Sequence, residues 1–352
     1  MPEPDLGELI DMQIRTTGPM SIATYMAICL SYPRLGYYSS GDPLGAGGDF
    51  VTAPEISQMF GELIGLWCVE LWHQLKEPRS FTLLELGPGR GTLMADLLRA
   101  ASKAPGFRDA MHLQLYDSNR DLRGQQQDRL RQYDPYWADG IDEVSDDDPL
   151  IVVANEFFDT VAIRQFVKRE DGWHERQVGL RDGKRAFGLS PLALANDVIP
   201  IAAEPGEIYE DGAAANAAMK LFAPIIARQR GAILAIDYGY DKTQAGETLQ
   251  AIRYHAVADP LEAPGETDLS AHVNFEALAK AATPLSTKLT TQRDFLTRLG
   301  IAERAAALAR ANPKEIPNIE LALKRLTGPD QMGELFKVFC AYSPGLEPAG
   351  FA

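Results

Sequence analysis

The chain has 352 residues, 45% of them hydrophobic and 24% charged, which is typical of globular proteins with a substantial core. Its formal net charge of −15 argues against general nucleic-acid binding, because an acidic surface repels the phosphate backbone. Three isolated cysteines without a CxxC pair argue against a disulfide scaffold or a zinc site. No HxxxH or HxH pair occurs either, so no metal site is expected.

No signal peptide, transit peptide or apolar run long enough to span a membrane is readable in the sequence. We therefore expect a cytoplasmic protein without a membrane span. Cys29, Cys68 and Cys340 lie in apolar stretches and are predicted to pack as small hydrophobic side chains.

The N-terminal part of the chain is predicted to be mainly helical. Helical periodicity covers residues 6–32, with a break at Gly18-Pro19 and Ser21 as a plausible N-cap. A stretch rich in Gly, Pro, Ser and Asp, 33–54, predicts a long loop. Helical periodicity returns over 56–75.

A glycine-rich turn follows an apolar strand that begins at Phe81, and it leads into a predicted helix over 92–102. Gly87 allows a sharp turn, Gly89 removes the side chain where a ligand must approach the backbone, and Gly91 allows close packing of the helix. The glycine spacing differs from GxGxxG, and no Lys-Ser or Lys-Thr follows, which excludes a P-loop. The simpler alternative is a tight turn without a ligand.

Two acids accompany this turn. Asp117 ends the second predicted strand, where its carboxylate could accept both ribose hydroxyls of a bound nucleoside or could simply cap the next helix. Glu85 lies in the first strand and could orient the turn or the amino acid end of a cofactor. The pattern EhGxGxG, with h an apolar residue, favours S-adenosylmethionine over NAD as that cofactor.

The rest of the chain alternates strands and helices. The expected elements are strands at 111–117, 150–154 and 232–236, helices at 118–133 and 213–228, a β-hairpin at 163–167 and 173–179, and a terminal strand within 334–341. Such alternation predicts an α/β fold with a doubly wound, mainly parallel sheet. We expect an N-terminal extension over 1–78 and a cofactor-binding domain over 79–352, with inserted substrate-binding regions at about 160–212 and 240–330.

Polar residues follow the predicted strand 150–154. Asn155, Glu156 and Asp159 stand at the ligand-binding edge of the sheet, and the two acids flank a pair of phenylalanines. A guanidinium stays protonated and is a poor nucleophile, so paired carboxylates could align it and accept its proton. The pattern therefore suggests catalytic acids for methyl transfer to arginine. The alternative is a capped turn with core phenylalanines.

Three further residues are candidates for lining the substrate site. Asp237 and Tyr238 end the next strand, and His272 lies in a later region that could cover the site. Turn formation for the first two and a structural role for the histidine are the alternatives.

Several motifs taken together resemble one family. They are Gly18-Pro-Met-Ser21, Pro33-Arg-Leu-Gly-Tyr-Tyr38, Gly48-Asp-Phe-Val-Thr-Ala-Pro-Glu-Ile-Ser57, Phe60-Gly-Glu62, Glu85-Leu-Gly-Pro-Gly-Arg-Gly-Thr-Leu-Met94, Asn155-Glu-Phe-Phe-Asp159, Ile236-Asp-Tyr-Gly239, Asp268-Leu-Ser-Ala-His-Val-Asn-Phe275, Thr291-Gln292 with Phe295-Leu296, and Met332-Gly-Glu-Leu-Phe-Lys337. Nearly end to end, the chain resembles the MidA-like family of class I methyltransferases. Asp117 stands where that family more often has Glu.

The resemblance implies a seven-stranded class I methyltransferase core with an N-terminal extension and an inserted hairpin. It also implies that Thr52, Pro54 and Glu55 lie near the cofactor or substrate. Mitochondrial members methylate an arginine of a core subunit of respiratory complex I, so the resemblance implies a protein substrate, with a homodimer possible. Two alternatives stay open: methylation of another protein or small molecule, and an assembly chaperone that binds the cofactor without catalysis.

Overall fold

The computed structural model describes residues 5–39, 52–117, 119–140, 143, 147–199 and 201–351. The chain divides into two compact units, each built from three segments. One unit comprises 1–50, 159–217 and 240–277, and the other comprises 51–158, 218–239 and 278–352. We call them the hairpin unit and the sheet unit.

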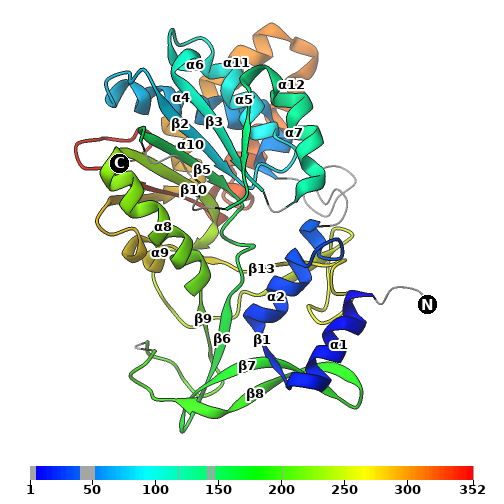
Figure 1. Ribbon diagram of the computed structural model, residues 1–352. Coiled ribbons are helices and arrows are strands. Elements are labelled where there is room, and N and C mark those ends of the chain that lie inside the picture. The colour runs from blue at the N-terminus through cyan, green and yellow to red at the C-terminus, as the bar shows by residue number, and fades with distance from the viewer. Residues whose placement is uncertain are drawn as a thin grey trace. The chain divides into compact units, whose positions relative to one another are not determined.

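The sheet unit is built around a large sheet with the strand order β15-β16-β10-β5-β2-β3-β4, of which Figure 1 labels β10, β5, β2 and β3. These strands are β2 (Phe81–Leu86), β3 (Met111–Tyr116), β4 (Tyr136–Ala138), β5 (Leu150–Asn155), β10 (Gly231–Tyr240), β15 (Ser286–Thr291) and β16 (Phe336–Tyr342). Pairing is parallel from β4 to β10, whereas β16 is antiparallel to both of its neighbours. The prediction of a mainly parallel methyltransferase sheet is confirmed.

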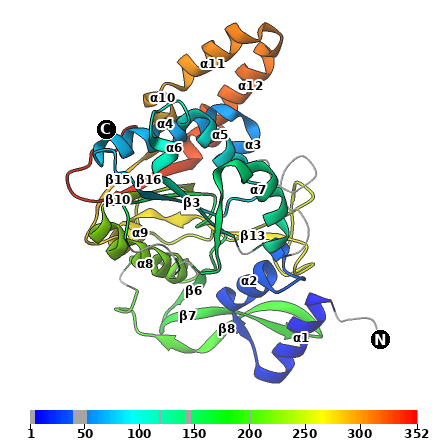
Figure 2. The same ribbon diagram turned by 45° about the horizontal axis from the view of Figure 1, so that its top comes forward.

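Helices cover both faces of this sheet, which explains why the inner strands are nearly continuous apolar runs. Every residue of β2 and β5 is buried. Figure 2 shows α4 (Gln58–Gln74) and α5 (Thr92–Ala101) on one side and α8 (Ala213–Gln229) on the other. The other helices of the unit are α3 (Ala53–Ile56), α6 (Phe107–Ala110), α7 (Arg123–Leu130), α10 (Gln292–Arg298), α11 (Ile301–Ala311), α12 (Ile316–Thr327) and α13 (Met332–Leu335).

The hairpin unit begins with α1 (Leu6–Thr17) and α2 (Ile22–Ser31), separated by the two-residue strand β1 (Met20–Ser21). As predicted, the Ser21 side chain caps α2 by accepting a hydrogen bond from the Thr24 amide at 3.0 Å. The other elements that begin in this unit are β6 (Arg164–Arg169), β7 (Gly172–Arg181), β8 (Lys184–Leu194), β9 (Ile208–Asp211), β11 (Gln250–Arg253), β12 (Ala256–Val257), β13 (Asp268–Ser270), β14 (Val273–Asn274) and α9 (Phe275–Ala281).

The predicted hairpin is confirmed as β6 and β7, but it is larger than expected. Strand β8 extends it antiparallel to β7, and β9 pairs with β6. Neither β8 nor β9 was predicted, because Gly188 and Pro191 interrupt β8 and because few residues of either strand are buried.

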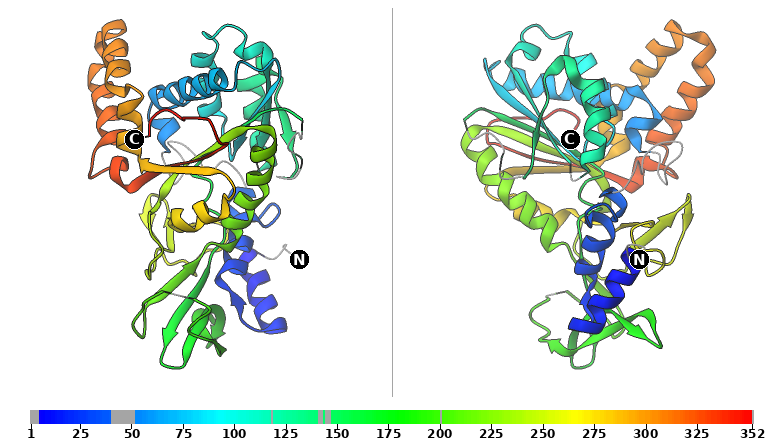
Figure 3. Two further views of the ribbon diagram at one scale, coloured as in Figure 1. Left: turned by 90° about the vertical axis from the view of Figure 1, so that its left-hand side faces the viewer. Right: turned by 45° about the vertical axis from the view of Figure 1, so that its right-hand side comes forward.

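Further differences concern the sheet unit. The helix predicted over 118–133 is shortened to α7, with single 3₁₀ turns before and after it. The structure adds the strands β4 and β15. The helices α11 and α12 pack against each other and lie side by side in Figure 3. The boundaries of the compact units also differ from the predicted domains, since α4 belongs to the sheet unit.

The three cysteines are free thiols and are buried, as predicted. Within the described ranges, no helix has the length and apolar character needed to cross a membrane. Across the same residues, no group of three or more histidine, cysteine or acidic side chains is arranged to hold a metal ion.

Candidate cofactor and active site

The glycine turn between β2 and α5 is left-handed at each of its three glycines. The φ angles of Gly87, Gly89 and Gly91 are 66°, 52° and 75°, values that side chains other than glycine rarely adopt. The Gly87 amide donates to the Tyr116 carbonyl at 2.8 Å, which joins the turn to the end of β3. A Cβ atom on Gly87 would lie 3.3 Å from Cδ2 of Phe157, so this backbone is also closely packed.

Gly91 is packed against α7. A Cβ atom there would lie 3.4 Å from Cδ1 of Leu130 and 3.6 Å from Cα of Gln126. The sequence argument expected Gly91 to allow close packing of the helix that follows the turn. The structure shows that its bare backbone also allows α7, a later helix of the chain, to pack closely.

Asp117 follows β3 and lies beside this turn. Its Oδ1 accepts from the Asn119 amide at 2.8 Å, and its Oδ2 accepts from Nε2 of Gln126 at 3.0 Å. Burial raises the pKa of Asp117 to about 6, although these bonds and a bond from the Gly89 backbone act to lower it. Each carboxylate oxygen can accept more than one hydrogen bond, so the acid remains able to bind ribose hydroxyls.

Two polar side chains at the ends of the neighbouring strands carry an unsatisfied oxygen. Glu85 on β2 and Asn155 on β5 are 2% and 9% exposed, and among the described residues neither Oε2 of Glu85 nor Oδ1 of Asn155 has a hydrogen-bond partner. Because Leu86 pairs with Ala154, both side chains project from the same face of the sheet. Burial, followed by the nearby charge of Asp117, raises the pKa of Glu85 to about 8. Buried acceptors of this kind fit a ligand that donates hydrogen bonds, such as an ammonium group.

Glu156 adopts an unusual backbone conformation directly after β5. Its φ is 50°, and its amide donates to the Ile236 carbonyl at 2.9 Å. Its Oε1 accepts from Nδ2 of Asn155 at 3.2 Å and from the Ala53 amide at 3.3 Å. The carboxylate is therefore held at the carboxyl end of the sheet.

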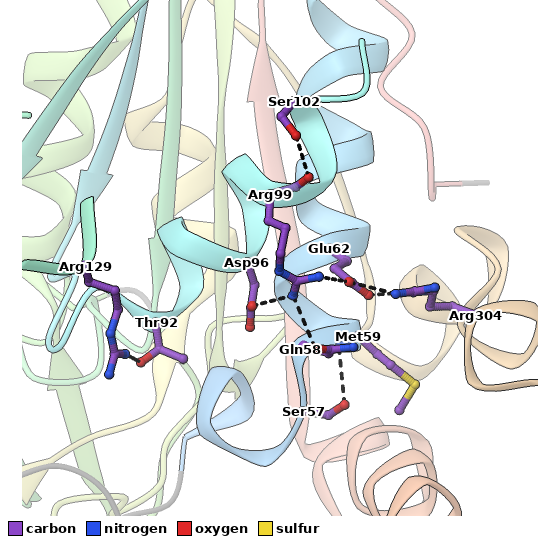
Figure 4. A network of polar contacts seen from close by, with 10 residues as sticks. All are labelled: Ser57, Gln58, Met59, Glu62, Thr92, Asp96, Arg99, Ser102, Arg129 and Arg304. Atoms are coloured by element: carbon purple, nitrogen blue, oxygen red, sulfur yellow. Dashed lines mark hydrogen bonds and ion pairs between the residues drawn. The ribbon is translucent and has the colours of Figure 1, made fainter. Parts of the chain in front are cut away.

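The short helix α3 brings the second half of the predicted 48–57 motif to the same edge, while residues 48–51 lie outside the described residues. Thr52 is the N-cap residue of α3, and Pro54 is buried in its first turn. Oε1 of Glu55 accepts from Oγ1 of Thr92 at 2.6 Å. Thr92 begins α5 and also contacts the Arg129 guanidinium (Figure 4). The motif thus contacts both the glycine-turn helix and Glu156.

Asp237 and Tyr238 on β10 have mainly structural surroundings. Oδ2 of Asp237 accepts from the Phe158 amide at 3.0 Å and Oδ1 from the Tyr238 amide at 3.0 Å. Tyr238 is buried in the main hydrophobic core, with its ring edge-on to Phe336 at a centroid distance of 5.4 Å. Asp237 therefore anchors the chain that follows Glu156, and Tyr238 packs the sheet.

The other predicted residues belong to the hairpin unit. Asp159 begins the second segment of the hairpin unit. The Asp159 carbonyl accepts a hydrogen bond from the Ala271 amide at 2.9 Å. Tyr38 places its hydroxyl 2.9 Å from both carboxylate oxygens of Asp268. Burial raises the pKa of Tyr38, and the charges of Asp268 and Asp159 add to the rise. The His272 amide donates to Oγ1 of Thr248 at 2.9 Å.

Sequence reasoning missed Gln126, which bonds both the glycine turn and Asp117. A glutamine within a polar run of α7 gives no signal of its own. The one indication in the sequence is position, because Gln126 lies nine residues after Asp117, on the helix that packs against Gly91.

Known proteins that are similar to this chain include S-adenosyl-L-methionine-dependent methyltransferases. A family model described as "Putative S-adenosyl-L-methionine-dependent methyltransferase" matches residues 63–292. The mitochondrial protein arginine methyltransferase NDUFAF7 of Danio rerio is 36% identical, over 93% of this chain and 84% of its own. The Homo sapiens protein of that name is 32% identical, over 93% and 81%.

Among solved structures, a Burkholderia thailandensis protein bound to S-adenosyl-homocysteine is similar with a TM-score of 0.86 and 28% identity. The match covers 97% of this chain and 92% of that chain. The relatives and this structure cover more than nine-tenths of the chain, so they include residues of both compact units.

Proposed function

The chain belongs to this family of S-adenosyl-L-methionine-dependent methyltransferases, and from that premise we propose that its methyl acceptor is an arginine side chain of a protein. The names of its relatives support a protein arginine as substrate. The observation that carries the proposal is Glu156, a carboxylate held at the end of β5 by two hydrogen bonds to one of its oxygens.

The residues around the glycine turn fit the cofactor. We propose that the bare backbone at Gly87, Gly89 and Gly91 borders it and that Asp117 accepts hydrogen bonds from its ribose. Glu85 and Asn155 supply the buried oxygens that would accept hydrogen bonds from its amino acid end. When bound, S-adenosylmethionine supplies a methyl group activated by a positively charged sulfur atom.

The acceptor side of the site must bind and orient a cation. A guanidinium remains protonated at neutral pH, and its nitrogens are poor nucleophiles. A carboxylate can pair with two of its N–H groups, align one nitrogen and later accept a proton. We propose that Glu156 does this, with Asn155 holding its carboxylate.

The remaining predicted site residues keep supporting roles in this proposal. Asp159 is the proposed second acid for the guanidinium, and Phe157 offers an aromatic ring for a cation. Thr52, Pro54 and Glu55 position the segment whose Ala53 amide bonds Glu156.

The family resemblance supports a proposal for the protein partner. We expect a basic segment of a respiratory complex I subunit, since the net charge of −15 favours a basic partner. A cytoplasmic location and a homodimer complete the proposal, while the curated relatives are named mitochondrial.

The test uses the purified protein, S-adenosylmethionine and candidate complex I subunits, with methylarginine measured by mass spectrometry. Wild-type protein should add methyl groups to one arginine. Glu156→Gln should retain S-adenosyl-homocysteine binding and lose 100-fold or more of the transfer rate, in keeping with the typical contribution of a general base. Glu303→Gln, an exposed change on α11, is the matched control.

The outcomes separate the alternatives. If mass spectrometry finds the added methyl group on a residue other than arginine, the proposed arginine acceptor is wrong. Assembly of complex I that is unchanged by Glu156→Gln but lost on deletion of the whole protein would favour a chaperone. Methylarginine that persists on the subunits of a deletion strain would contradict the proposed partner.

A further inference from the structure

We infer that Gln126 is a positioning residue of the cofactor site and that Trp137 sets its orientation. The two residues would hold the Gly89 backbone and the Asp117 carboxylate in the arrangement that receives the nucleoside. The inference rests on the cofactor site of the proposed function and is independent of which acceptor is methylated.

The contacts of Gln126 use both ends of its side-chain amide. Nε2 donates to the Gly89 carbonyl at 2.7 Å and to Oδ2 of Asp117 at 3.0 Å. Oε1 accepts from Nε1 of Trp137 at 2.7 Å. The side chain is fully buried, so each of these bonds replaces a contact with water. One buried amide thus links α7 with three other parts of the sheet unit.

The chemistry of the three partners determines the orientation of the amide. An indole N–H only donates, so Trp137 requires the oxygen end of Gln126. A backbone carbonyl only accepts, so Gly89 requires the nitrogen end, and an ionised Asp117 requires it as well. All three partners therefore specify the same rotamer of the amide group, and Trp137 keeps the two N–H groups directed at the turn and the acid.

Packing makes this link stiff. Cα of Gln126 would lie 3.6 Å from a Cβ atom on Gly91, so α7 lies directly against the glycine turn. Holding the turn and the acid in place before binding lowers the ordering cost when the nucleoside arrives. This describes a role in affinity for the cofactor that acts through Asp117 and Gly89.

The link also affects the charge of the acid. Burial raises the pKa of Asp117 to about 6, and the hydrogen bond from Gln126 opposes that rise. The other groups that act on Asp117 are Arg123 on α7, which lowers its pKa, and Glu85 on β2. Tyr116, at the end of β3, is the remaining titratable neighbour. Removal of the Gln126 amide should therefore move the titration of Asp117 to higher pH.

The experiment measures S-adenosyl-homocysteine binding by calorimetry between pH 5 and pH 8. In the wild type, affinity should weaken as pH falls through about 6, because protonated Asp117 is a poorer acceptor for ribose hydroxyls. Gln126→Leu should weaken binding about 10-fold or more at pH 7.5 and move the pH midpoint upward. Gln127→Leu, an exposed change on the same helix, should alter neither.

A second variant covers the possibility that Gln126→Leu does not fold. Trp137→Phe keeps an aromatic ring and removes only the indole N–H, which releases the amide to rotate. It should weaken binding about 3-fold and shift the pH midpoint in the same direction. The combination Gln126→Leu with Trp137→Phe should be no weaker than Gln126→Leu alone, because both changes remove one linked arrangement.

Unchanged cofactor binding in these variants would overturn the inference. Variants that fold and bind S-adenosyl-homocysteine with the wild-type affinity and pH midpoint would show that Gln126 only fills space. A wild-type protein that binds the ligand but methylates something other than arginine would overturn the proposed substrate and leave this inference intact.

Discussion

The end of β3 and the ends of β2 and β5 lie in one sheet, yet their polar groups are satisfied in different ways. At β3, both oxygens of Asp117 accept hydrogen bonds from the protein itself. At β2 and β5, Glu85 and Asn155 each keep a buried oxygen that no donor within the described part of the chain reaches. The first region is held by hydrogen bonds within the protein, and the second is the one for which we propose a ligand partner.

The difference explains why these acids have unequal charges. Asp117 gains several donors, and its pKa is raised only to about 6. Burial, followed by the nearby charge of Asp117, raises the pKa of Glu85 to about 8, and no donor within the described residues opposes that rise at its Oε2. At neutral pH the fold therefore keeps Asp117 ionised and Glu85 mostly protonated, so one acid is ready as an acceptor and the other avoids an uncompensated charge.

The largest expected effect comes from a change in the turn that joins these two regions. Gly89→Val places a branched side chain on backbone with φ of 52°, where the ligand must also approach. Affinity for S-adenosyl-homocysteine, measured by calorimetry, should fall about 100-fold or more, which corresponds to about 2.7 kcal/mol. Gly188→Val on β8, where a Cβ atom meets open space, should bind normally.

A pH series sharpens the comparison at Glu85. Its raised pKa means that the folded protein binds this proton more tightly than the unfolded chain. The free energy of unfolding should therefore fall as pH rises from about 4.5 to about 8. Glu85→Gln removes this titration, so its melting temperature relative to wild type should increase from pH 5.5 to pH 8.5. A constant difference across that range would contradict the assignment.

Asn155 offers a smaller test of the same idea. Asn155→Ala removes a buried oxygen for which the described ranges offer no partner, together with one hydrogen bond to Glu156. Stability of the free protein should change by about 1 kcal/mol or less. The thermal stabilisation given by saturating S-adenosyl-homocysteine should nevertheless decrease. An unchanged ligand-induced shift in melting temperature would place Asn155 outside the cofactor site.

The smallest effect on binding is expected at an ion-pair network away from both regions. Arg304 on α11 donates to both carboxylate oxygens of Glu62 on α4, at 2.6 and 2.8 Å, and Arg99 on α5 contacts the same acid (Figure 4). Burial favours the protonated acid, but these hydrogen bonds outweigh it and lower the pKa of Glu62. Arg304→Met should reduce stability by about 1–3 kcal/mol and leave ligand affinity unchanged. Arg310→Met is the matched control.

The sequence predicted the parts of the site that depend on local spacing. The strand, the three glycines and the acid at the end of the second strand follow the period of a βαβ unit, and the structure places Asp117 beside the turn. Gln126 and Trp137 depend instead on the packing of α7 against Gly91 and on the three-residue strand β4, which has too few residues to show a pattern.

The surroundings of the residues at the strand ends also depend on tertiary packing, which the sequence pattern does not show. Asp237 is predicted to line the substrate site, and its hydrogen bonds from two backbone amides, one of them that of Phe158 on a distant segment, depend on the fold in the same way. Glu156 was predicted to be a site residue, yet its positive φ and its bond to Ala53 depend on tertiary contacts that no local pattern encodes.

The position of β16 has a consequence for biosynthesis. Residues 336–342 lie between β10 and β15 and pair with β10 along seven positions, from Ala232 to Tyr238. A ribosome must therefore translate nearly every other element before the central part of this sheet can close. A message cut short before Phe336 would yield a polypeptide with the apolar edge of β10 exposed, and such an edge readily pairs with other chains.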